Sequence, residues 1–254
     1  MQTFTRNNLS LAYERRGHGA PLVLIHGFPL DHSIWNEVAP LLENDFDLIL
    51  PDLRGFGQSD RTSPPFTMND LADDIAGLLD HLGFQSAHLA GHSMGGYVAL
   101  AFAQGHVSRV RGLALVASQA GADTPERRAG RYTEAAHIAE HGTGDIVAGM
   151  TTKLSADERV RRYVHDLMKK QSPAGMIGAI KAMAERRDNL SVLAAASFPV
   201  ALIHGDADAL IPVSKAQEVH AAVSSAKLFT ITGAGHMPMM ESPQAVAEAL
   251  KWFL

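Results

Sequence analysis

The 254-residue sequence contains no cysteine, which rules out disulfide bonds and any metal or redox site built on thiolates. No apolar run approaches the ~18 residues of a membrane-spanning helix, and the first eight residues lack a basic segment followed by an apolar signal core. Basic residues are not in excess either: the formal net charge is −5 and no basic cluster is present, so nucleic acid is not an expected partner. The simplest expected location is the cytoplasm.

The chain is long enough for one α/β domain with an inserted subdomain. Strand-like and helix-like segments alternate along it, which predicts a mostly parallel sheet covered on both faces. The first two strands are expected to pair as an antiparallel hairpin through Asn7-Asn8, a residue pair that tolerates turn geometry. Predicted strands cover residues 2–6, 10–15, 21–25, 47–50, 86–90, 110–117, 200–204 and 227–231. Predicted helices cover residues 69–82, 96–104, 214–222 and 242–253.

The pattern changes between residues 119 and 197, where no convincing strand occurs and several segments are typical of helices. Ser155-Ala156-Asp157-Glu158 is a capping-box sequence that predicts a helix to about residue 170, and Ser172-Pro173 predicts another to about residue 187. We therefore expect residues 1–118 and 198–254 to form the core and residues 119–197 to form a helical cap subdomain.

Ser93 lies at the centre of Gly91-His92-Ser93-Met94-Gly95, a Gly-x-Ser-x-Gly sequence. A short apolar run precedes it and a helix-like stretch follows it, and strand, sharp turn and helix are the setting of a nucleophile elbow. Glycine is needed at 91 and 95 because side chains there would collide with the neighbouring strand and helix. A serine hydroxyl is a poor nucleophile without a base and a group that orients the base.

The chain offers both partners in the order serine, aspartate, histidine. His236 stands in Thr232-Gly233-Ala234-Gly235-His236, on an expected loop after the last strand. Two aspartates, Asp206 and Asp208, follow the strand at 200–204. This order is found in α/β-hydrolases and differs from the chymotrypsin and subtilisin orders.

The sequence as a whole resembles α/β-hydrolases of the serine esterase, lactonase and cofactor-free haloperoxidase branch. Besides the elbow and the histidine loop, His26-Gly27-Phe28-Pro29 is similar to the family's oxyanion loop, and Asp52 to Ser59 is similar to its turn after the next strand. The resemblance implies an eight-stranded α/β-hydrolase fold with its cap between strands 6 and 7. It also implies that Asp208 is the acid of the triad, and that the backbone amides of Phe28 and Met94 form the oxyanion hole.

Phe28, Met94 and Met237 are the residues we expect to contact substrate, whereas methionines in the cap are more often core residues. His26 is expected to brace the oxyanion loop. A metal site at His204, Asp206 and Asp208 is weakly indicated, because the glycine at 205 makes a shared face doubtful.

The sequence thus predicts a carboxylic-ester hydrolase that needs no metal or cofactor and acts on small to medium acyl esters or lactones through Ser93, His236 and Asp208. The resemblance to haloperoxidases adds perhydrolysis as a side activity. Two alternatives stay open: a lyase or carbon–carbon bond hydrolase with the same triad, and a ligand receptor that signals through the cap. Oligomeric state is not readable from the sequence.

Overall fold

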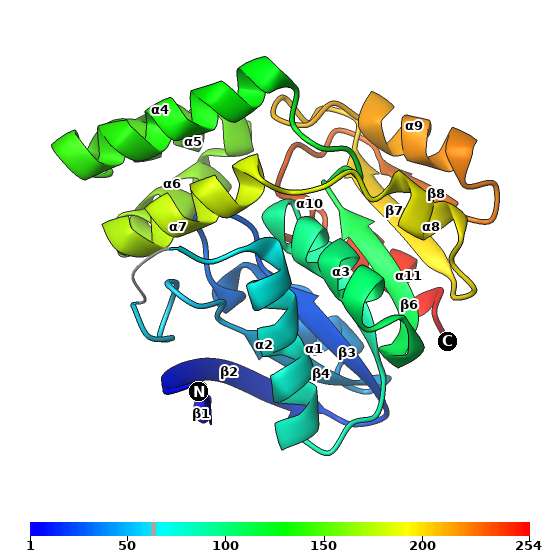
Figure 1. Cartoon of the computed structure of the whole chain (residues 1–254). Coiled ribbons are helices and arrows are strands. Elements are labelled where there is room, and N and C mark those ends of the chain that lie inside the picture. The colour runs from blue at the N-terminus through cyan, green and yellow to red at the C-terminus, as the bar shows by residue number, and fades with distance from the viewer. Residues whose placement is uncertain (62–64) are drawn as a thin grey trace.

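The computed structural model describes residues 1–61 and 65–254. Its centre is an eight-stranded sheet in the order β1-β2-β4-β3-β5-β6-β7-β8, in which β1–β2 and β2–β4 are antiparallel and every other pair is parallel (Figure 1). The mostly parallel sheet predicted from the sequence is confirmed. The strands are β1 (Gln2–Arg6), β2 (Leu9–Gly17), β3 (Ala20–Ile25), β4 (Phe46–Pro51), β5 (Ala87–His92), β6 (Val110–Val116), β7 (Val200–Gly205) and β8 (Lys227–Ile231).

The hairpin between β1 and β2 turns at Asn7 and Asn8, whose φ angles are 49° and 64°. Positive φ at both central residues matches the right-handed twist of the two strands, and asparagine tolerates it better than most residues. The predicted hairpin is therefore confirmed, with Arg6 facing Leu9 across the turn.

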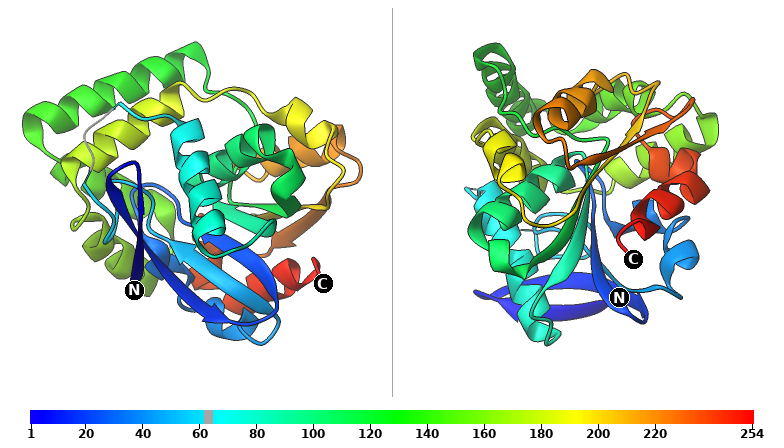
Figure 2. Two further views of the ribbon diagram at one scale, coloured as in Figure 1. Left: turned by 60° about the horizontal axis from the view of Figure 1, so that its bottom comes forward. Right: turned by 90° about the vertical axis from the view of Figure 1, so that its right-hand side faces the viewer.

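Alternating residues of the central strands pack into two hydrophobic clusters, one on each face of the sheet. Val23 and Ile25 belong to the first cluster, whereas Leu22 and Leu24 belong to the second. The helices α2, α3 and α9 contribute to the first cluster, and α1 and α11 to the second, so the sheet is covered on both sides (Figure 2, right). The bounds are α1 (Ala39–Leu42), α2 (Met68–His81), α3 (Met94–Gly105), α9 (Ser214–Ala222) and α11 (Pro243–Lys251).

Five helices follow one another between β6 and β7, and four of them, α4 to α7, gather at one end of the sheet (Figure 1). All five lie inside the predicted cap range, although the subdivision at residues 119 and 197 stays a prediction. Their bounds are α4 (Pro125–His141), α5 (Gly144–Leu154), α6 (Glu158–Met168), α7 (Pro173–Ala184) and α8 (Leu190–Ala194). Short helices elsewhere are η1 (His32–Trp35), η2 (Val107–Arg109) and α10 (Pro238–Glu241).

The residues that begin the cap helices differ in part from the prediction. Ser172 is the N-cap of α7, as predicted, and its hydroxyl accepts a hydrogen bond from the Gly175 amide at 3.0 Å. The predicted capping box at Ser155 is wrong: Asp157 is the N-cap of α6, and the Ser155 hydroxyl bonds Glu241 instead. The Asp157 carboxylate lies two residues closer to the helix and accepts from the free amides of Arg159 and Val160. The Ser155 hydroxyl therefore does not cap the helix and bonds outside it.

In the part of the chain that the structure describes, no helix has the length and apolar character that crossing a membrane requires.

Candidate active site

Ser93 stands at the junction of β5 and α3 with φ 51° and ψ −113°, a backbone conformation that costs a non-glycine residue strain energy. Two contacts with β6 and the residues after it hold this turn in place. The Ser93 amide donates to the Val116 carbonyl at 2.9 Å, and the Ser118 hydroxyl donates to the Ser93 carbonyl at 2.7 Å. The sharp turn lifts the half-buried serine side chain out of the sheet.

Gly91 and Gly95 make this turn sterically possible. A Cβ atom at Gly91 would lie 2.2 Å from the Gly95 carbonyl oxygen, and one at Gly95 would lie 2.4 Å from the Ile25 carbonyl oxygen. Both contacts are with backbone atoms, which cannot move aside cheaply. The expected collisions with the neighbouring helix and strand are therefore present.

His236 and Asp208 lie in contact, both buried, at the ends of β8 and β7. His236 Nδ1 is 2.8 Å from Asp208 Oδ2, so the imidazole donates its Nδ1 proton to the carboxylate. This bond leaves Nε2 without a proton and able to accept one, which is the tautomer that a general base needs.

The Asp208 carboxylate accepts three hydrogen bonds: Oδ1 from the amides of Leu210 and Ile211 at 2.8 and 2.9 Å, and Oδ2 from His236. His204 Nε2, which bonds the Ile211 carbonyl oxygen at 2.7 Å, also lies 3.3 Å from Oδ2. Burial by itself raises the pKa of Asp208, but the contacts with His204 and His236 outweigh it and bring this pKa well below its usual range. The carboxylate is therefore ionised wherever the protein is folded near neutral pH.

Asp206 has a different environment although it follows the same strand. Its side chain is exposed, and Oδ1 accepts a hydrogen bond from the Gly233 amide at 2.7 Å. Asp206 thus links the loop after β7 to the loop that carries His236, and only Asp208 reaches the imidazole.

The oxyanion loop lies directly against the elbow. A Cβ atom at Gly27 would lie 2.5 Å from His92 Nδ1, so only glycine allows this approach. Neither the Phe28 amide nor the Met94 amide donates to a protein acceptor in residues 1–61 and 65–254. Two backbone donors are thus available next to Ser93, which is what stabilisation of a developing oxyanion requires.

His26 is fully buried and makes two hydrogen bonds to backbone groups. Nδ1 is 2.8 Å from the Gly27 carbonyl oxygen, and Nε2 accepts from the Leu53 amide at 3.0 Å. Burial lowers the pKa of His26, so the ring is neutral with its proton on Nδ1. These contacts connect the oxyanion loop to the turn after β4, the bracing role expected from the sequence.

The histidine loop and the elbow meet through His92, the residue before the serine. His92 Nε2 donates to the His236 carbonyl oxygen at 2.8 Å, and the two rings are 4.9 Å apart. No hydrogen bond joins the Ser93 hydroxyl to His236 within the described ranges. Such bonds are often long without substrate and shorten in the reactive complex. The contact through His92 connects the histidine loop to the residue next to Ser93.

A cavity of about 620 Å³ opens above Ser93. Phe28, Ser93 and Tyr97 line it from the core, and the loop after β7 forms a further wall. Ile146 and Met150 of α5 line it from the cap together with Met183 of α7. The expected cap over the serine is thus matched by a cavity between the cap helices and the elbow.

Of the three residues predicted to contact substrate, one lines the cavity and two have side chains buried in the core. Phe28 lines the cavity, but the side chains of Met94 and Met237 have no exposed surface and belong to the two core clusters. Met94 keeps a place in the site only through its backbone amide. The cap methionines Met150 and Met183, which we expected in the core, are the ones on the cavity wall.

Glu241 of α10 is a site residue that sequence reasoning missed. Its carboxylate accepts from the Gly235 amide at 2.5 Å and from the Ser155 hydroxyl. The His236 amide also donates to the Leu154 carbonyl at 3.1 Å. The histidine loop is therefore bonded to Leu154 directly and to the next residue, Ser155, through Glu241. No local sequence motif predicts a role for Glu241, because its partners Ser155 and Gly235 come from two segments that are far apart in the sequence.

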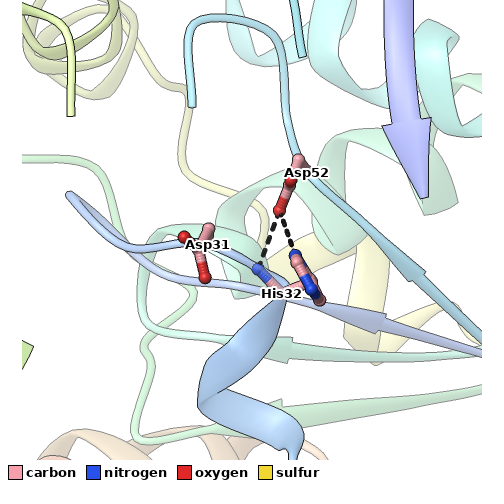
Figure 3. Close-up of side chains that lie close together, drawn as sticks. All are labelled: Asp31, His32 and Asp52. Atoms are coloured by element: carbon pink, nitrogen blue, oxygen red, sulfur yellow. Dashed lines mark hydrogen bonds and ion pairs between the residues drawn. The ribbon is translucent and has the colours of Figure 1, made fainter. Parts of the chain in front are cut away.

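One group of three side chains in the described residues has the spacing of metal ligands: Asp31, His32 and Asp52 (Figure 3). Its atoms already have partners. Asp52 Oδ1 accepts from the amide and from Nδ1 of His32, at 2.9 and 2.7 Å, and Asp31 Oδ1 accepts from Ser33. This geometry is that of an N-cap and a buried ion pair. The weakly indicated trio at 204, 206 and 208 does not converge, since Asp206 turns to Gly233.

A family model described as the alpha/beta hydrolase fold matches residues 20–243. The match spans most of the chain, and the chain therefore belongs to the α/β-hydrolase fold family.

Three similar proteins place it further within this family. The dihydrolipoyllysine-residue acetyltransferase component of the acetoin cleaving system of Pseudomonas putida is 32% identical over 246 residues, which are 93% of this chain and 64% of that protein. The chain thus spans less than two thirds of that relative. The structure of a thermophilic esterase from Thermogutta terrifontis with malate bound is 35% identical, with a TM-score of 0.93 over 99% of this chain and 95% of that chain. Bromoperoxidase from Bacillus anthracis is 25% identical, with a TM-score of 0.86 over 96% and 95%.

Proposed function

We propose that the chain is a serine carboxylic-ester hydrolase in which Ser93 is the nucleophile, His236 the general base and acid, and Asp208 the group that orients the histidine. The backbone amides of Phe28 and Met94 form the oxyanion hole. The observation that carries the proposal is the buried Asp208–His236 pair, which leaves Nε2 free to accept a proton and is connected through His92 to the strained turn of Ser93. Similarity to the Thermogutta terrifontis esterase supports the same reaction class.

In the first half of the reaction, Ser93 Oγ bonds to the acyl carbon while its proton passes to His236 Nε2. The carbonyl electron pair moves onto the oxygen, where the Phe28 and Met94 amides stabilise the negative charge. The intermediate then expels the alcohol, which takes the proton back from His236, and an acyl-enzyme remains. Water attacks the acyl-enzyme with His236 again as base, which releases the acid and restores the Ser93 hydroxyl.

The volume and lining of the cavity support this substrate class. A volume of about 620 Å³ with Phe28, Met150 and Met183 on its walls suits small to medium acyl esters or lactones. The Gly27–Phe28 loop packs closely on His92 and leaves little room beside the acyl carbonyl. Esters of bulky tertiary alcohols are therefore expected to be poor substrates.

The proposal is tested with p-nitrophenyl esters from acetyl to dodecanoyl, using wild type and Ser93→Ala in parallel. Fast turnover that peaks at short or middle chains and disappears in Ser93→Ala supports it. Negligible turnover by folded protein contradicts it and favours a lyase, a carbon–carbon bond hydrolase or a ligand receptor with the same fold.

We also propose perhydrolysis as a side activity, because the chain is similar to a bromoperoxidase and carries Phe28-Pro29 beside the oxyanion position. Peroxide would replace water in the attack on the acyl-enzyme, giving a peracid in place of the acid. Incubation with acetate and peroxide tests this; absence of Ser93-dependent peracid dismisses it.

A further inference from the structure

Charged side chains line the cavity where α4, α5 and the adjoining loops meet. Four of them are basic although the whole chain has a net charge of −5: Arg127, Arg131, Lys153 and Lys215. Two of the four basic side chains are balanced by exposed ion pairs, since Arg127 pairs with Glu134 at 3.3 Å and Lys215 with Glu218 at 2.8 Å. Exposed pairs of this kind contribute little to binding or stability.

Two of the three acidic side chains that line the cavity also form ion pairs with neighbouring residues. Asp145 pairs with His137 at 2.9 Å, and Glu134 is the partner of Arg127. The remaining acidic side chain, Asp123, is different because it is buried and bonds two arginines at once.

Asp123, Arg131 and Arg186 form a buried cluster, with side chains 3%, 8% and 3% exposed. Asp123 Oδ1 accepts from Arg186 Nη1 at 2.7 Å, and Oδ2 accepts from Arg131 Nε. Burial alone raises the pKa of Asp123, but the two arginines outweigh it and the pKa is lowered, so the carboxylate is ionised. One carboxylate and two guanidinium groups leave one buried positive charge in excess.

Two nitrogens of Arg186 have acceptors in the protein, whereas Nη2 is buried without a hydrogen-bond partner in the described residues. Nε donates to the Gly121 carbonyl, Nη1 also donates to the Met183 carbonyl, and the guanidinium lies 4.2 Å from the centre of the Tyr97 ring. Arg186 does not line the large cavity, so its charge is used inside the protein.

Arg131 does line the cavity, beside Met183, and Tyr97 and Ser93 of the core line the same cavity. Its Nε bonds Asp123 and its Nη1 lies 3.5 Å from Met183 Sδ. Nη2 has no acceptor in the described part of the chain and is not among the fully enclosed side-chain atoms, so it keeps accessible surface on the residue that lines the cavity. A carboxylate in the cavity can accept a hydrogen bond from Nη2 and balance the excess charge of the cluster.

We propose that Arg131 binds a carboxylate at the end of the substrate remote from the scissile ester, so that the enzyme acts on half-esters of dicarboxylic acids or on lactones that carry a carboxylate. This inference rests on the proposed ester hydrolysis at Ser93 and names its substrate class. The alternative is a purely structural cluster that connects α4 to the end of α7 and to the loop before α4. Such a cluster affects stability but does not discriminate between charged and uncharged substrates.

Arg131→Gln separates the two roles. It removes the excess charge and the free Nη2, while Asp123 keeps its ion pair with Arg186, so no buried carboxylate is left without a partner. Arg128→Gln is the matched control, since it makes the same change three residues earlier, at an exposed arginine that pairs with Glu185. Thermal unfolding of both variants checks that they fold.

The kinetic experiment compares mono-p-nitrophenyl adipate with p-nitrophenyl hexanoate, which have the same acyl length and differ in the terminal carboxylate. Hydrogen bonds to charged groups contribute enough for about a tenfold or greater preference. Wild type and Arg128→Gln are expected to favour the adipate ester at least tenfold in kcat/KM, and Arg131→Gln to bring the ratio to within about twofold of one. A wild-type ratio near one, or the same ratio in Arg131→Gln, overturns the inference.

A binding experiment tests the carboxylate site independently of hydrolysis. Calorimetry with Ser93→Ala compares monomethyl adipate with methyl hexanoate, with and without Arg131→Gln. Tighter binding of monomethyl adipate that requires Arg131 supports the site, and equal binding of the two esters overturns it. If neither p-nitrophenyl ester shows Ser93-dependent turnover, the proposed hydrolysis fails while calorimetry still decides whether Arg131 binds a carboxylate.

Discussion

Replacing Asp208 by asparagine changes the group that faces His236 while keeping the shape of the side chain. The orientation of the new amide is set by the structure. The Oδ1 position accepts from the Leu210 and Ile211 amides, so only an oxygen fits there, and the NH₂ group must take the Oδ2 position facing His236. His236 Nδ1 then has to accept a hydrogen bond, which moves the imidazole proton to Nε2.

The consequence for catalysis is large because that tautomer cannot accept the serine proton. In Ser-His-Asp triads the wrong tautomer lowers kcat by about 10⁴-fold, which corresponds to about 5.5 kcal/mol of activation free energy. We expect a loss of this size for Asp208→Asn with p-nitrophenyl butyrate.

The matched control is Asp206→Asn, two residues away. The asparagine Oδ1 atom can still accept from the Gly233 amide, and the exposed side chain has no contact with His236. We expect kcat within roughly twofold of wild type, as for most surface substitutions. Circular dichroism and thermal unfolding check that both variants fold. Equal, mild effects of the two changes, or a loss below tenfold in a folded Asp208→Asn, would refute the assignment of Asp208.

Three further substitutions test other parts of the site and fold. Gly95→Ala places a Cβ atom 2.4 Å from the Ile25 carbonyl oxygen, so we expect loss of activity and a decrease of about 2 kcal/mol or more in the free energy of unfolding by urea. The control is Gly105→Ala in the same helix, where the Cβ atom would meet open space and the free energy of unfolding should stay unchanged or increase. Glu241→Leu removes the acceptor for the Gly235 amide next to His236 and is expected to lower kcat by about tenfold or more, while Glu241→Gln keeps an acceptor and should stay close to wild type. Burial lowers the pKa of His88 from 6.5 to about 4, so the unfolded state binds a proton at this position more readily than the folded state does. The free energy of unfolding is therefore highest above pH 6.5 and falls by up to roughly 3 kcal/mol toward pH 4. Denaturant titrations across this pH range should show a smaller decrease for His88→Phe.

The sheet could be predicted almost residue by residue because its signals are local. The strand at residues 227–231 and the helix at 214–222 have the predicted bounds, and Asn7-Asn8 forms the predicted turn. Each depends on an apolar run or a turn-forming pair that acts the same way in any fold. The glycines of the elbow are also predictable from the sequence. Gly91 is required by a contact with Gly95 four residues later, and Gly95 by a contact with Ile25 of the adjacent strand.

The cap could be predicted only in outline, because α4 packs partly through an arginine that a periodicity argument counts as exposed. The buried residues of α4 are Arg131, Ala135 and Ile138. An arginine in the buried stripe is stable only through Asp123, and Asp123 is also held by Arg186, 63 residues further along the chain. No local pattern reveals such a cluster.

The same reason explains the errors at the substrate site. Met94 and Met237 are neighbours of the proposed catalytic residues Ser93 and His236 in the sequence, yet both side chains turn into the core. Met150 and Met183 line the cavity instead, because the tertiary placement of α5 and α7 decides which of their faces meets it.

The central claim, that Ser93 forms an acyl-enzyme oriented by this site, is tested most directly by mixing the protein with excess p-nitrophenyl acetate and following the first, pre-steady-state turnover. Rapid quenching and peptide mass spectrometry then locate any acyl group. We predict one acetyl group per chain on the peptide that contains Ser93, formed together with p-nitrophenolate and absent from Ser93→Ala. Release of p-nitrophenolate with no acylated Ser93 peptide, or with the acetyl group on another residue, would contradict the account.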